Sequence, residues 1–192
     1  MNVTTLFGSP RPGSNSTALA EYLLSSLERK GAHVRRYKLN KLNYRGCQGC
    51  FGCKTSSERC VLRDDLTDAL DSLYEADVLL LASSVYYGDV TSQMKGFIDR
   101  IYSFYVPEFW AKEIKTRLPS GKKILFILTQ GNGDESQYAD IAPKYSALIG
   151  THGFADSGTI RICGISPTDD ILKMSVATAQ ADSLAENLLR TI

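Results

Sequence analysis

The chain has 192 residues, 43% of them hydrophobic and 22% charged, and this size and composition are typical of one globular domain. Its 22 Lys and Arg residues nearly balance 21 Asp and Glu residues, and the formal net charge of +1 excludes a general attraction to nucleic acid or to an anionic membrane. The longest apolar runs, 78–82 and 124–128, are far shorter than the roughly 20 residues of a bilayer span. No basic, apolar leader follows Met1, so we expect a cytoplasmic protein. From the balanced charge we expect its partner to be a small molecule.

Short β-branched runs alternate with segments of helical periodicity along the chain. Five strands are predicted, at Asn2–Phe7, His33–Leu39, Val78–Ser83, Lys123–Thr129 and Asp156–Ile162. Helices are predicted between and after them, at Ser16–Lys30, Asp65–Tyr74, Thr91–Phe104, Gln137–Thr151 and Asp169–Leu189. The third and fourth strands are apolar throughout, as central strands are, whereas the second alternates and is predicted to be an edge. The pattern favours an α/β fold, a three-layer doubly wound sheet of five parallel strands in the order 2-1-3-4-5.

Two irregular segments interrupt this alternation, at Asn40–Asp64 and Val106–Lys122. We interpret both as insertions within a single domain, residues 1–192, and the first contains a cysteine-rich loop at 44–63. The second carries Phe109 and Trp110. The sequence leaves open whether this aromatic segment covers a ligand or forms a contact between subunits.

The loop after the first predicted strand reads GSPRPGSNST and leads directly into a helix. Amides at a helix N-terminus bind phosphate, the hydroxyls of Ser9, Ser14, Ser16 and Thr17 are further donors, and Arg11 adds charge. The same residues are also compatible with a simple capped turn. Because the loop is neither G-x-G-x-x-G nor a Walker pattern, a mononucleotide with one terminal phosphate is favoured over a dinucleotide or a nucleoside triphosphate.

This loop is similar to the phosphate loop of the NAD(P)H-dependent FMN reductase family of flavodoxin-like proteins. Residues 83–100, SSVYYGDVTSQMKGFIDR, resemble the same family's signature S-P-x-Y…S-x-x-(M/L)-K-x-F-x-D-R, except that Ser84 stands at the usual proline. Within this signature, Asp99 and Arg100 are expected to form an ion pair on a helix surface. The resemblance covers about residues 2–165 and implies a flavodoxin-like, FMN-binding domain.

The resemblance further implies that three loops bind FMN. The opening loop would hold the phosphate, the loop after the third strand would line the isoalloxazine ring, and the loop after the fourth strand would follow its pyrimidine side. The expected cofactor-binding residues are Ser9, Arg11, Ser14, Asn15, Ser16, Thr17, Val85, Tyr86, Tyr87, Gly88, Asp89, Thr129, Gln130, Gly131 and Asn132. No catalytic side chain is expected, because hydride transfer to FMN requires no acid, base or nucleophile from the protein.

Four of the five cysteines, Cys47, Cys50, Cys53 and Cys60, are spaced C-x2-C-x2-C-x6-C. Thiolates at this spacing suit the corners of an iron–sulfur cluster. The pattern resembles the iron-sulfur flavoproteins, a branch of the same family, and this implies a 4Fe-4S cluster bound by these four residues. The competing interpretations are a zinc site, and cysteines that are free thiols or form an adventitious disulfide.

These expectations together indicate an enzyme, an FMN-dependent oxidoreductase of the NAD(P)H-dependent FMN reductase or iron-sulfur flavoprotein type. The resemblance implies NAD(P)H or reduced ferredoxin as the electron donor, a quinone, oxygen or a redox protein as the acceptor, and a homodimer or homotetramer. One alternative is a flavodoxin-like electron carrier, which the near-neutral charge disfavours because such carriers are strongly acidic. Another is a cluster-free NAD(P)H:quinone or FMN reductase.

Overall fold

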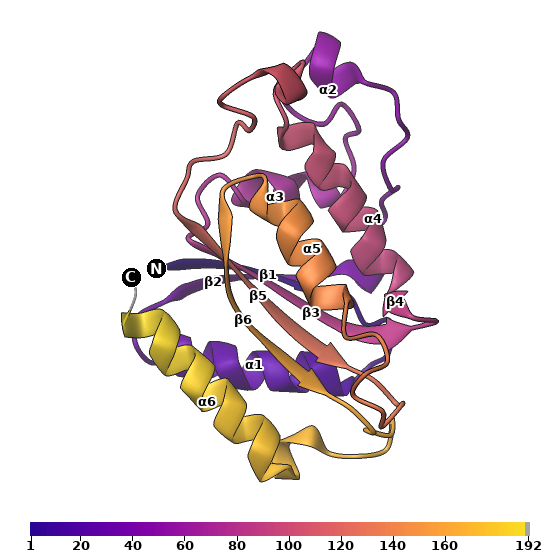
Figure 1. The fold of residues 1–192 in the computed structure, drawn as a ribbon, viewed down its shortest axis with the longest axis vertical. Helices are drawn as coiled ribbons and strands as arrows, with labels where there is room; N and C mark the ends of the chain where they lie inside the picture. The colour runs from indigo at the N-terminus through magenta and orange to yellow at the C-terminus, as the bar shows by residue number, and fades with distance from the viewer. Residues whose placement is uncertain (191–192) are drawn as a thin grey trace.

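Five parallel strands form the central sheet in the order β2-β1-β3-β5-β6, and a short antiparallel strand, β4, pairs with β3 (Figure 1). The strands are β1 (Asn2–Phe7), β2 (His33–Lys38), β3 (Val78–Tyr86), β4 (Asp89–Val90), β5 (Lys122–Thr129) and β6 (Phe154–Ile162). This computed structural model describes residues 1–190, so the last two residues of the predicted domain lie outside it. The predicted fold class and the order of the five parallel strands are confirmed, with β2 at an edge, and β4 is an addition.

Helices cover both faces of the sheet, with α1 and α6 on one face and α3, α4 and α5 on the other (Figure 1). The helices are α1 (Asn15–Glu28), α2 (Gly52–Thr55), α3 (Leu66–Ser72), α4 (Ser92–Arg100), α5 (Ile141–Gly150) and α6 (Ser175–Arg190). Four short 3-10 helices complete the set, η1 (Leu39–Lys41), η2 (Ile101–Phe104), η3 (Phe109–Ala111) and η4 (Ile171–Lys173). No helix among the 190 described residues is both long and apolar enough to cross a membrane.

The two faces of the sheet carry separate hydrophobic cores. Along β3, Leu79 and Leu81 pack into the core beneath α3, α4 and α5, whereas Val78 and Leu80 pack against α1 and α6. All four side chains are at most 1% exposed. Since burying one such side chain contributes roughly 1.5–3 kcal/mol, the apolar central strands fix the layered arrangement that the sequence pattern predicts.

Several predicted helix boundaries are wrong by a few residues. The helix predicted at Thr91–Phe104 is α-helical only to Arg100 and continues as η2. The one predicted from Gln137 begins at Ile141, because Tyr138 has a φ of +63° that a helix cannot contain. The last predicted helix is divided, since the Asp170 carboxylate caps η4 and α6 starts only at Ser175.

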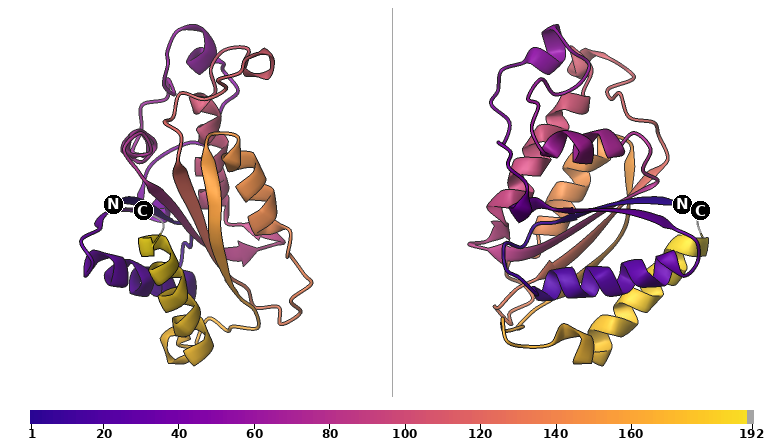
Figure 2. Two further views of the ribbon diagram at one scale, coloured as in Figure 1. Left: turned by 60° about the vertical axis from the view of Figure 1, so that its left-hand side comes forward. Right: turned by 180° about the vertical axis from the view of Figure 1, so that it is seen from behind.

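The two insertions lie together at one end of the molecule, where α2 stands beside the segment that carries η3 (Figure 2). Arg117 of the second insertion donates a hydrogen bond to the carbonyl of Cys53 in the first (3.1 Å). The aromatic segment at 106–122 is therefore a neighbour of the cysteine-rich loop.

Candidate functional site

The loop between β1 and α1 ends at Ser14, the N-cap of α1. The Ser14 hydroxyl accepts a hydrogen bond from the Thr17 amide (3.3 Å) and donates one to the Thr17 hydroxyl (2.8 Å). Just before the cap, Gly13 has a φ of +62°, which the absence of a side chain makes favourable. Because the first amides of a helix have no intrahelical acceptor and lie at the positive end of the helix dipole, this turn suits an anionic group.

Arg11 on the same loop has an unsatisfied hydrogen-bond donor. Its Nε is buried and has no hydrogen-bond partner among residues 1–190, while its backbone amide donates to the hydroxyl of Ser9 (3.4 Å). Leaving a buried donor without an acceptor costs about 1–3 kcal/mol, and more when the group is charged. The loop therefore fits a ligand that supplies an acceptor there, such as a phosphate oxygen.

A pocket of about 190 Å³ opens where β1, β3 and β5 end, and we call it the rim pocket. Its wall consists of Arg11, Asn15, Ser84, Val85, Tyr86, Thr129, Gln130, Gly131, Ile165 and Pro167. Residues from all three of the loops expected to bind FMN thus meet in one cavity. This cavity lies at the carboxyl ends of the strands, where ligands of doubly wound sheets bind.

Three residues of the rim pocket are not among the cofactor-binding residues expected from the sequence: Ser84, Ile165 and Pro167. The Ser84 hydroxyl lies 3.5 Å from the hydroxyls of both Ser9 and Thr129, and so connects the ends of three neighbouring strands. The other two residues follow β6. The strand order predicts a ligand site at the switch point between β1 and β3, and it does not predict that the segment after β6 contributes to this site.

Other residues selected from the sequence lie near the rim pocket without lining it. They are Ser9 and Ser14 on the opening loop, Ser16 and Thr17 in the first turn of α1, Tyr87, Gly88 and Asp89 after β3, and Asn132 after β5. Ser14, Ser16 and Thr17 lie at the N-terminus of α1, so a ligand that extends from the pocket along the opening loop would reach them.

The β3–β4 hairpin turns through Tyr87 and Gly88, which both have positive φ (+50° and +83°). Tyr86 lines the rim pocket and is 41% exposed, whereas the Tyr87 side chain is completely exposed. The hairpin thus presents two tyrosines in succession beside the pocket, one in its wall and one in solvent.

The carboxylate of Asp89 is engaged by α5. It accepts hydrogen bonds from Lys144 (2.9 Å) and from the Tyr145 hydroxyl (2.8 Å). Partial burial alone would raise the pKa of Asp89, but these bonds and the Val90 amide hold the pKa below its usual value. Asp89 therefore stays ionised and fastens the hairpin to α5.

Gln130 supports the loop after β5. Its side-chain amide donates to the carbonyl of Asn132 (3.0 Å) and accepts a hydrogen bond from Arg161 (3.2 Å). Its backbone amide is bonded to the Ile162 carbonyl (2.9 Å). With these groups occupied, Gln130 shapes the wall of the rim pocket, and the exposed Gly131 beside it leaves the backbone accessible to a ligand.

All four candidate ligand cysteines line a second pocket of about 310 Å³, the cysteine pocket. Cys53 is buried in α2, Cys60 is half-buried, and Cys47 and Cys50 are exposed. Within residues 1–190, no three Cys, His, Asp or Glu side chains lie in an arrangement that could hold a metal ion. The four thiols are thus gathered at one pocket without being arranged as metal ligands.

Two cations contact Cys53. The ammonium of Lys54 lies 3.3 Å from its Sγ and donates to the Tyr102 carbonyl (2.8 Å), and Arg117 donates to the Cys53 carbonyl (3.1 Å). Burial lowers the pKa of Lys54, and its hydrogen bond to Cys53 opposes this effect. The hydrogen bonds of both cations go to sulfur or to backbone oxygen in the described chain, so two positive charges lie beside Cys53.

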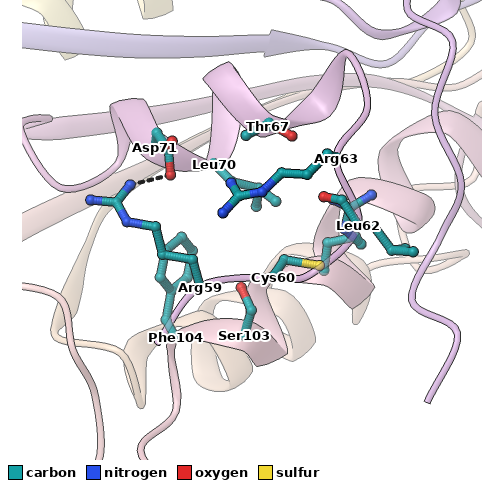
Figure 3. Close-up of a pocket in the computed structure, with 10 residues that line it drawn as sticks. Arg59, Cys60, Leu62, Arg63, Thr67, Leu70, Asp71, Ser103 and Phe104 are labelled. Atoms are coloured by element: carbon teal, nitrogen blue, oxygen red, sulfur yellow. Dashed lines mark hydrogen bonds and ion pairs between the residues drawn. The ribbon is translucent and has the colours of Figure 1, made fainter. Parts of the chain in front are cut away.

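The second half of the cysteine-rich loop is anchored on α3. Arg59 forms an ion pair with Asp71 (Figure 3). Its guanidinium also lies 4.5 Å from the centre of the Tyr74 ring. Beside Cys60, the side chain of Arg63 extends along the same helix (Figure 3). The cavity enclosed between these groups is about 10 Å³, which is too small for a ligand.

The predicted surface ion pair between Asp99 and Arg100 is wrong. Arg100 is 1% exposed and pairs with Asp64 (2.8 Å), whereas Asp99 pairs with Lys95 one helical turn earlier. Adjacent residues of a helix point in different directions, while residues four apart are neighbours on its surface. Arg100 instead lines the cysteine pocket.

Comparison with known proteins adds to this geometry. A family model described as NADPH-dependent FMN reductase matches residues 1–142. An iron-sulfur flavoprotein from Archaeoglobus fulgidus is 39% identical over 106 residues, which are 54% of this chain and 47% of that protein. The chain spans about half the length of the curated relatives it matches.

Solved structures share the fold over nearly the whole chain. The NAD(P)H:quinone oxidoreductase from Methanothermobacter marburgensis has a TM-score of 0.73 at 20% identity, covering 98% of this chain and 96% of that one. An FMN-dependent NADH-azoreductase from Bacillus anthracis, in complex with FMN, has a TM-score of 0.70 at 15% identity and covers 97% and 98%. At these identities the likeness shows the fold, here a flavodoxin-like one.

Proposed function

Because the chain belongs to the NADPH-dependent FMN reductase family, we propose that it is an FMN-dependent oxidoreductase that takes electrons from NAD(P)H. The observation that carries this proposal is the rim pocket, in which three separate loops meet beside a buried Arg11 Nε that has no acceptor among residues 1–190. A phosphate at the N-terminus of α1 would supply that acceptor, and the rest of a mononucleotide would extend toward Tyr86. FMN combines such a phosphate with a flat aromatic ring.

The roles of the residues follow from their positions. The hydroxyls of Ser9, Ser14, Ser16 and Thr17, the side chain of Asn15 and the guanidinium of Arg11 would bind the phosphate end. Val85, Tyr86, Tyr87, Gly88 and Asp89 would flank the ring, with Asp89 acting as the anchor of the hairpin. Thr129, Gln130, Gly131 and Asn132 would form the pyrimidine side. When bound, FMN supplies the hydride-accepting and electron-transferring chemistry, and we propose no side chain as acid, base or nucleophile.

We also propose that Cys47, Cys50, Cys53 and Cys60 bind a 4Fe-4S cluster. Supporting this, the four thiols share one pocket, two cations contact Cys53, and several relatives carry the name iron-sulfur flavoprotein. Arg100 lies in the wall of this pocket, and positive charge beside thiol ligands suits an anionic cluster. The thiols would have to draw together around it, because they do not lie as metal ligands in the described chain.

The proposed partners follow the same reasoning. A nearly neutral chain suits a small electron acceptor such as a quinone, and one relative is named FMN-dependent NADH:quinone oxidoreductase. Reduced ferredoxin as an alternative donor, and assembly as a homodimer or homotetramer, belong to the proposal as well.

The test is purification under anaerobic conditions followed by absorption spectroscopy, flavin and acid-labile sulfide assays, and mixing with NADH or NADPH. We expect flavin bands above a broad iron–sulfur shoulder and rapid bleaching of the flavin by a nicotinamide donor. Flavin without sulfide would support the cluster-free reductase, and reduction only by a protein donor would support the electron carrier. A protein that binds no added FMN would overturn the proposal.

Replacing Arg11 with Ala tests the phosphate assignment directly. Loss of a charge-assisted hydrogen bond, worth about 1.5–3 kcal/mol, should weaken FMN binding about ten- to a hundredfold in a fluorescence titration. Arg29→Ala is the matched control, because Arg29 is exposed at the other end of α1, where its guanidinium donates to the Ser26 hydroxyl. Equal FMN affinity in the two variants would contradict the assignment.

A further inference from the structure

A buried guanidinium joins the two ends of the cysteine-rich loop. It acts together with hydrogen bonds between Asn43 and Asp65 and between the Arg45 amide and Asp64. Arg100, at the end of α4, has a side chain that is 0% exposed. One terminal nitrogen donates to the Asp64 carboxylate (2.8 Å) and to the carbonyl of Arg45 (2.9 Å), and the other donates to the carbonyl of Leu62 (3.1 Å). Three acceptors from two separate stretches of chain are thus held by one side chain.

The two carbonyls bracket the four cysteines. Arg45 lies two residues before Cys47, and Leu62 lies two residues after Cys60. Every candidate ligand is therefore inside the loop that Arg100 closes. Holding the two ends together limits the conformations that the loop can adopt, so part of the entropy cost of gathering the thiols has been met before any metal binds.

The third nitrogen of the same guanidinium, Nε, is without a partner in the part of the chain that the structure describes. Nε of Arg100 is buried and makes no hydrogen bond within the described residues, and Arg100 belongs to the wall of the cysteine pocket. A charged donor left unsatisfied in a buried position is unfavourable. An anionic group held by the thiols would lie against this wall, where hydrogen bonds to sulfur stabilise bound clusters.

We propose that Arg100 is the positioning residue of the four-cysteine site, which closes the loop so that the thiols share one pocket. The inference rests on the metal site of the proposed function. Arginine suits this task because its planar fork can bond several acceptors in fixed directions, whereas a lysine ammonium is a compact point charge. Arg100→Lys therefore keeps the charge and should lose the simultaneous hydrogen bonds to the carbonyls of Arg45 and Leu62.

The first measurement uses Co²⁺ alone as the probe, added to reduced, metal-free protein without oxygen. We expect wild-type protein to give the visible absorption bands of tetrahedral thiolate coordination. In Arg100→Lys the affinity for Co²⁺ should fall about ten- to a hundredfold, as is usual when a group that orients metal ligands is lost, and the bands should weaken. FMN affinity should not change, since Arg100 is absent from the rim pocket.

The second measurement is hydrogen exchange of residues 45–62 in metal-free protein, which reports on loop closure without any metal. Exchange should be faster in Arg100→Lys than in wild type. Arg36→Lys is the control for both measurements, because Arg36 also binds carboxylates, those of Glu21 and Glu28, but on β2. If Arg100→Lys does not fold, Asp64→Asn replaces it, since this variant removes the charged partner and should loosen the loop in the same direction.

The outcomes separate the two proposals. Unchanged Co²⁺ affinity, absorption and loop exchange in the variant would overturn the role of Arg100 while leaving the metal site standing. Wild-type protein that binds neither Co²⁺ nor iron would refute the metal site. In that case unchanged loop exchange would also overturn the role of Arg100, and faster exchange would support its closing of the loop.

Discussion

At the level of single residues, Tyr87 has a left-handed backbone conformation that is unfavourable for a tyrosine. It stands with Gly88 in a two-residue hairpin turn with positive φ at both positions, the arrangement of a type I′ turn. Asn and Gly prefer this turn, whereas a bulky side chain in the left-handed region costs about 1–2 kcal/mol. Since the side chain is fully exposed, packing within the chain does not offset the strain. Its place beside the rim pocket suggests a functional reason for keeping it.

Tyr87→Asn should therefore separate stability from binding. We expect the free energy of unfolding of the FMN-free protein to rise by about 1 kcal/mol, because an Asn-Gly pair fits the turn, while FMN affinity falls. Chemical denaturation and fluorescence titration measure the two effects. Glu108→Asn is the control, since Glu108 is also exposed with positive φ (+54°) but lies before η3, and it should gain stability without losing FMN. Loss of stability in Tyr87→Asn would refute the strain argument.

His152 is a buried histidine among aromatic rings. It is 3% exposed, its ring centre lies 4.0 Å from that of Tyr105, and Nδ1 lies 3.3 Å from the Thr116 hydroxyl. Burial, and secondarily the charge of Lys54, lower its pKa from 6.5 to about 4. The folded protein therefore holds this imidazole in the neutral form over most of the physiological range.

This lowered pKa predicts a pH dependence of stability. The unfolded chain takes up the proton near pH 6.5 and the folded chain only near pH 4, so stability is complete above pH 6.5 and decreases as the pH falls. At 1.36 kcal/mol per pKa unit, the decrease reaches about 3 kcal/mol at pH 4. His152→Gln should flatten the profile measured by denaturant titration between pH 7 and 4, and the exposed His33→Gln should not. Identical profiles for all three proteins would show that His152 protonation is not coupled to folding.

At the level of elements, the first turn of α1 has a structural and a proposed functional role. Ser14 caps the helix through the Thr17 amide, and the same turn is the proposed phosphate site. Replacing a serine cap by alanine costs typically about 1 kcal/mol. Because α1 packs its leucines into the core shared with α6, loss of the cap should lower the stability of the whole fold.

Ser14→Ala should lower the free energy of unfolding of the FMN-free protein by about 1 kcal/mol, and Ser14→Asn should restore most of it, since asparagine is an equally good cap. Thermal and chemical denaturation measure both variants. Ser25→Ala serves as the control, because Ser25 is an exposed residue of α1 whose hydroxyl bonds only within the helix, to the Glu21 carbonyl. A loss in Ser25→Ala equal to that in Ser14→Ala would contradict the capping role.

The sequence pattern predicts those elements whose burial dictates their composition. β5 is apolar on both faces and is predicted to within one residue. The start of β3 is also predicted, but β3 ends at Tyr86 and not at the predicted Ser83, because Ser83 and Ser84 interrupt its apolar run. β4 has only two residues and therefore no periodicity to detect. Helix starts were less predictable because single residues decide them, as the positive φ of Tyr138 does before α5. Helix propensity is a property of a whole segment, whereas the conformation of a single strained residue is set by tertiary packing.

The candidate sites were predictable to the extent that their residues follow strands in the sequence. Arg11, Tyr86 and Gly131 come after β1, within the end of β3 and after β5, so the strand order alone brings them together. Ile165 and Arg100 reach their pockets through the packing of distant segments. For Arg100 the adjacent Asp99 suggested the wrong partner, because closeness in sequence is not closeness on a helix surface.

At the level of the whole molecule, α4 connects the two candidate sites. Its N-cap, Thr91, donates to the carbonyl of Gly8 at the start of the opening loop (2.7 Å), and its last residue, Arg100, lines the cysteine pocket. With nine residues, α4 is about 13 Å long at 1.5 Å per residue. A rigid helix between two proposed redox sites keeps their separation constant, which electron transfer between them would require.

The insertion around η3 should unfold together with the rest of the chain. Arg117 ties this insertion to Cys53, and the Phe109 ring of the insertion stacks on the Tyr105 ring just before it, with their centres 4.0 Å apart. Trp110, the only tryptophan of the chain, lies in the insertion and reports on it by fluorescence, whereas far-ultraviolet circular dichroism reports mainly on the sheet and the long helices. In a single cooperative domain the two probes give the same denaturation midpoint.

We expect coincident midpoints for wild-type protein, and a joint shift when FMN is added, because a ligand at 100 times its dissociation constant stabilises the folded chain by about 2.7 kcal/mol. Arg117→Met should move the tryptophan transition to lower denaturant than the dichroism transition, since it removes the hydrogen bonds to Cys53 and Ser103. Lys112→Met, in the same exposed insertion, serves as the control and should leave the midpoints together. If the wild-type transitions already separate, the insertion folds independently and the prediction of a single domain is wrong.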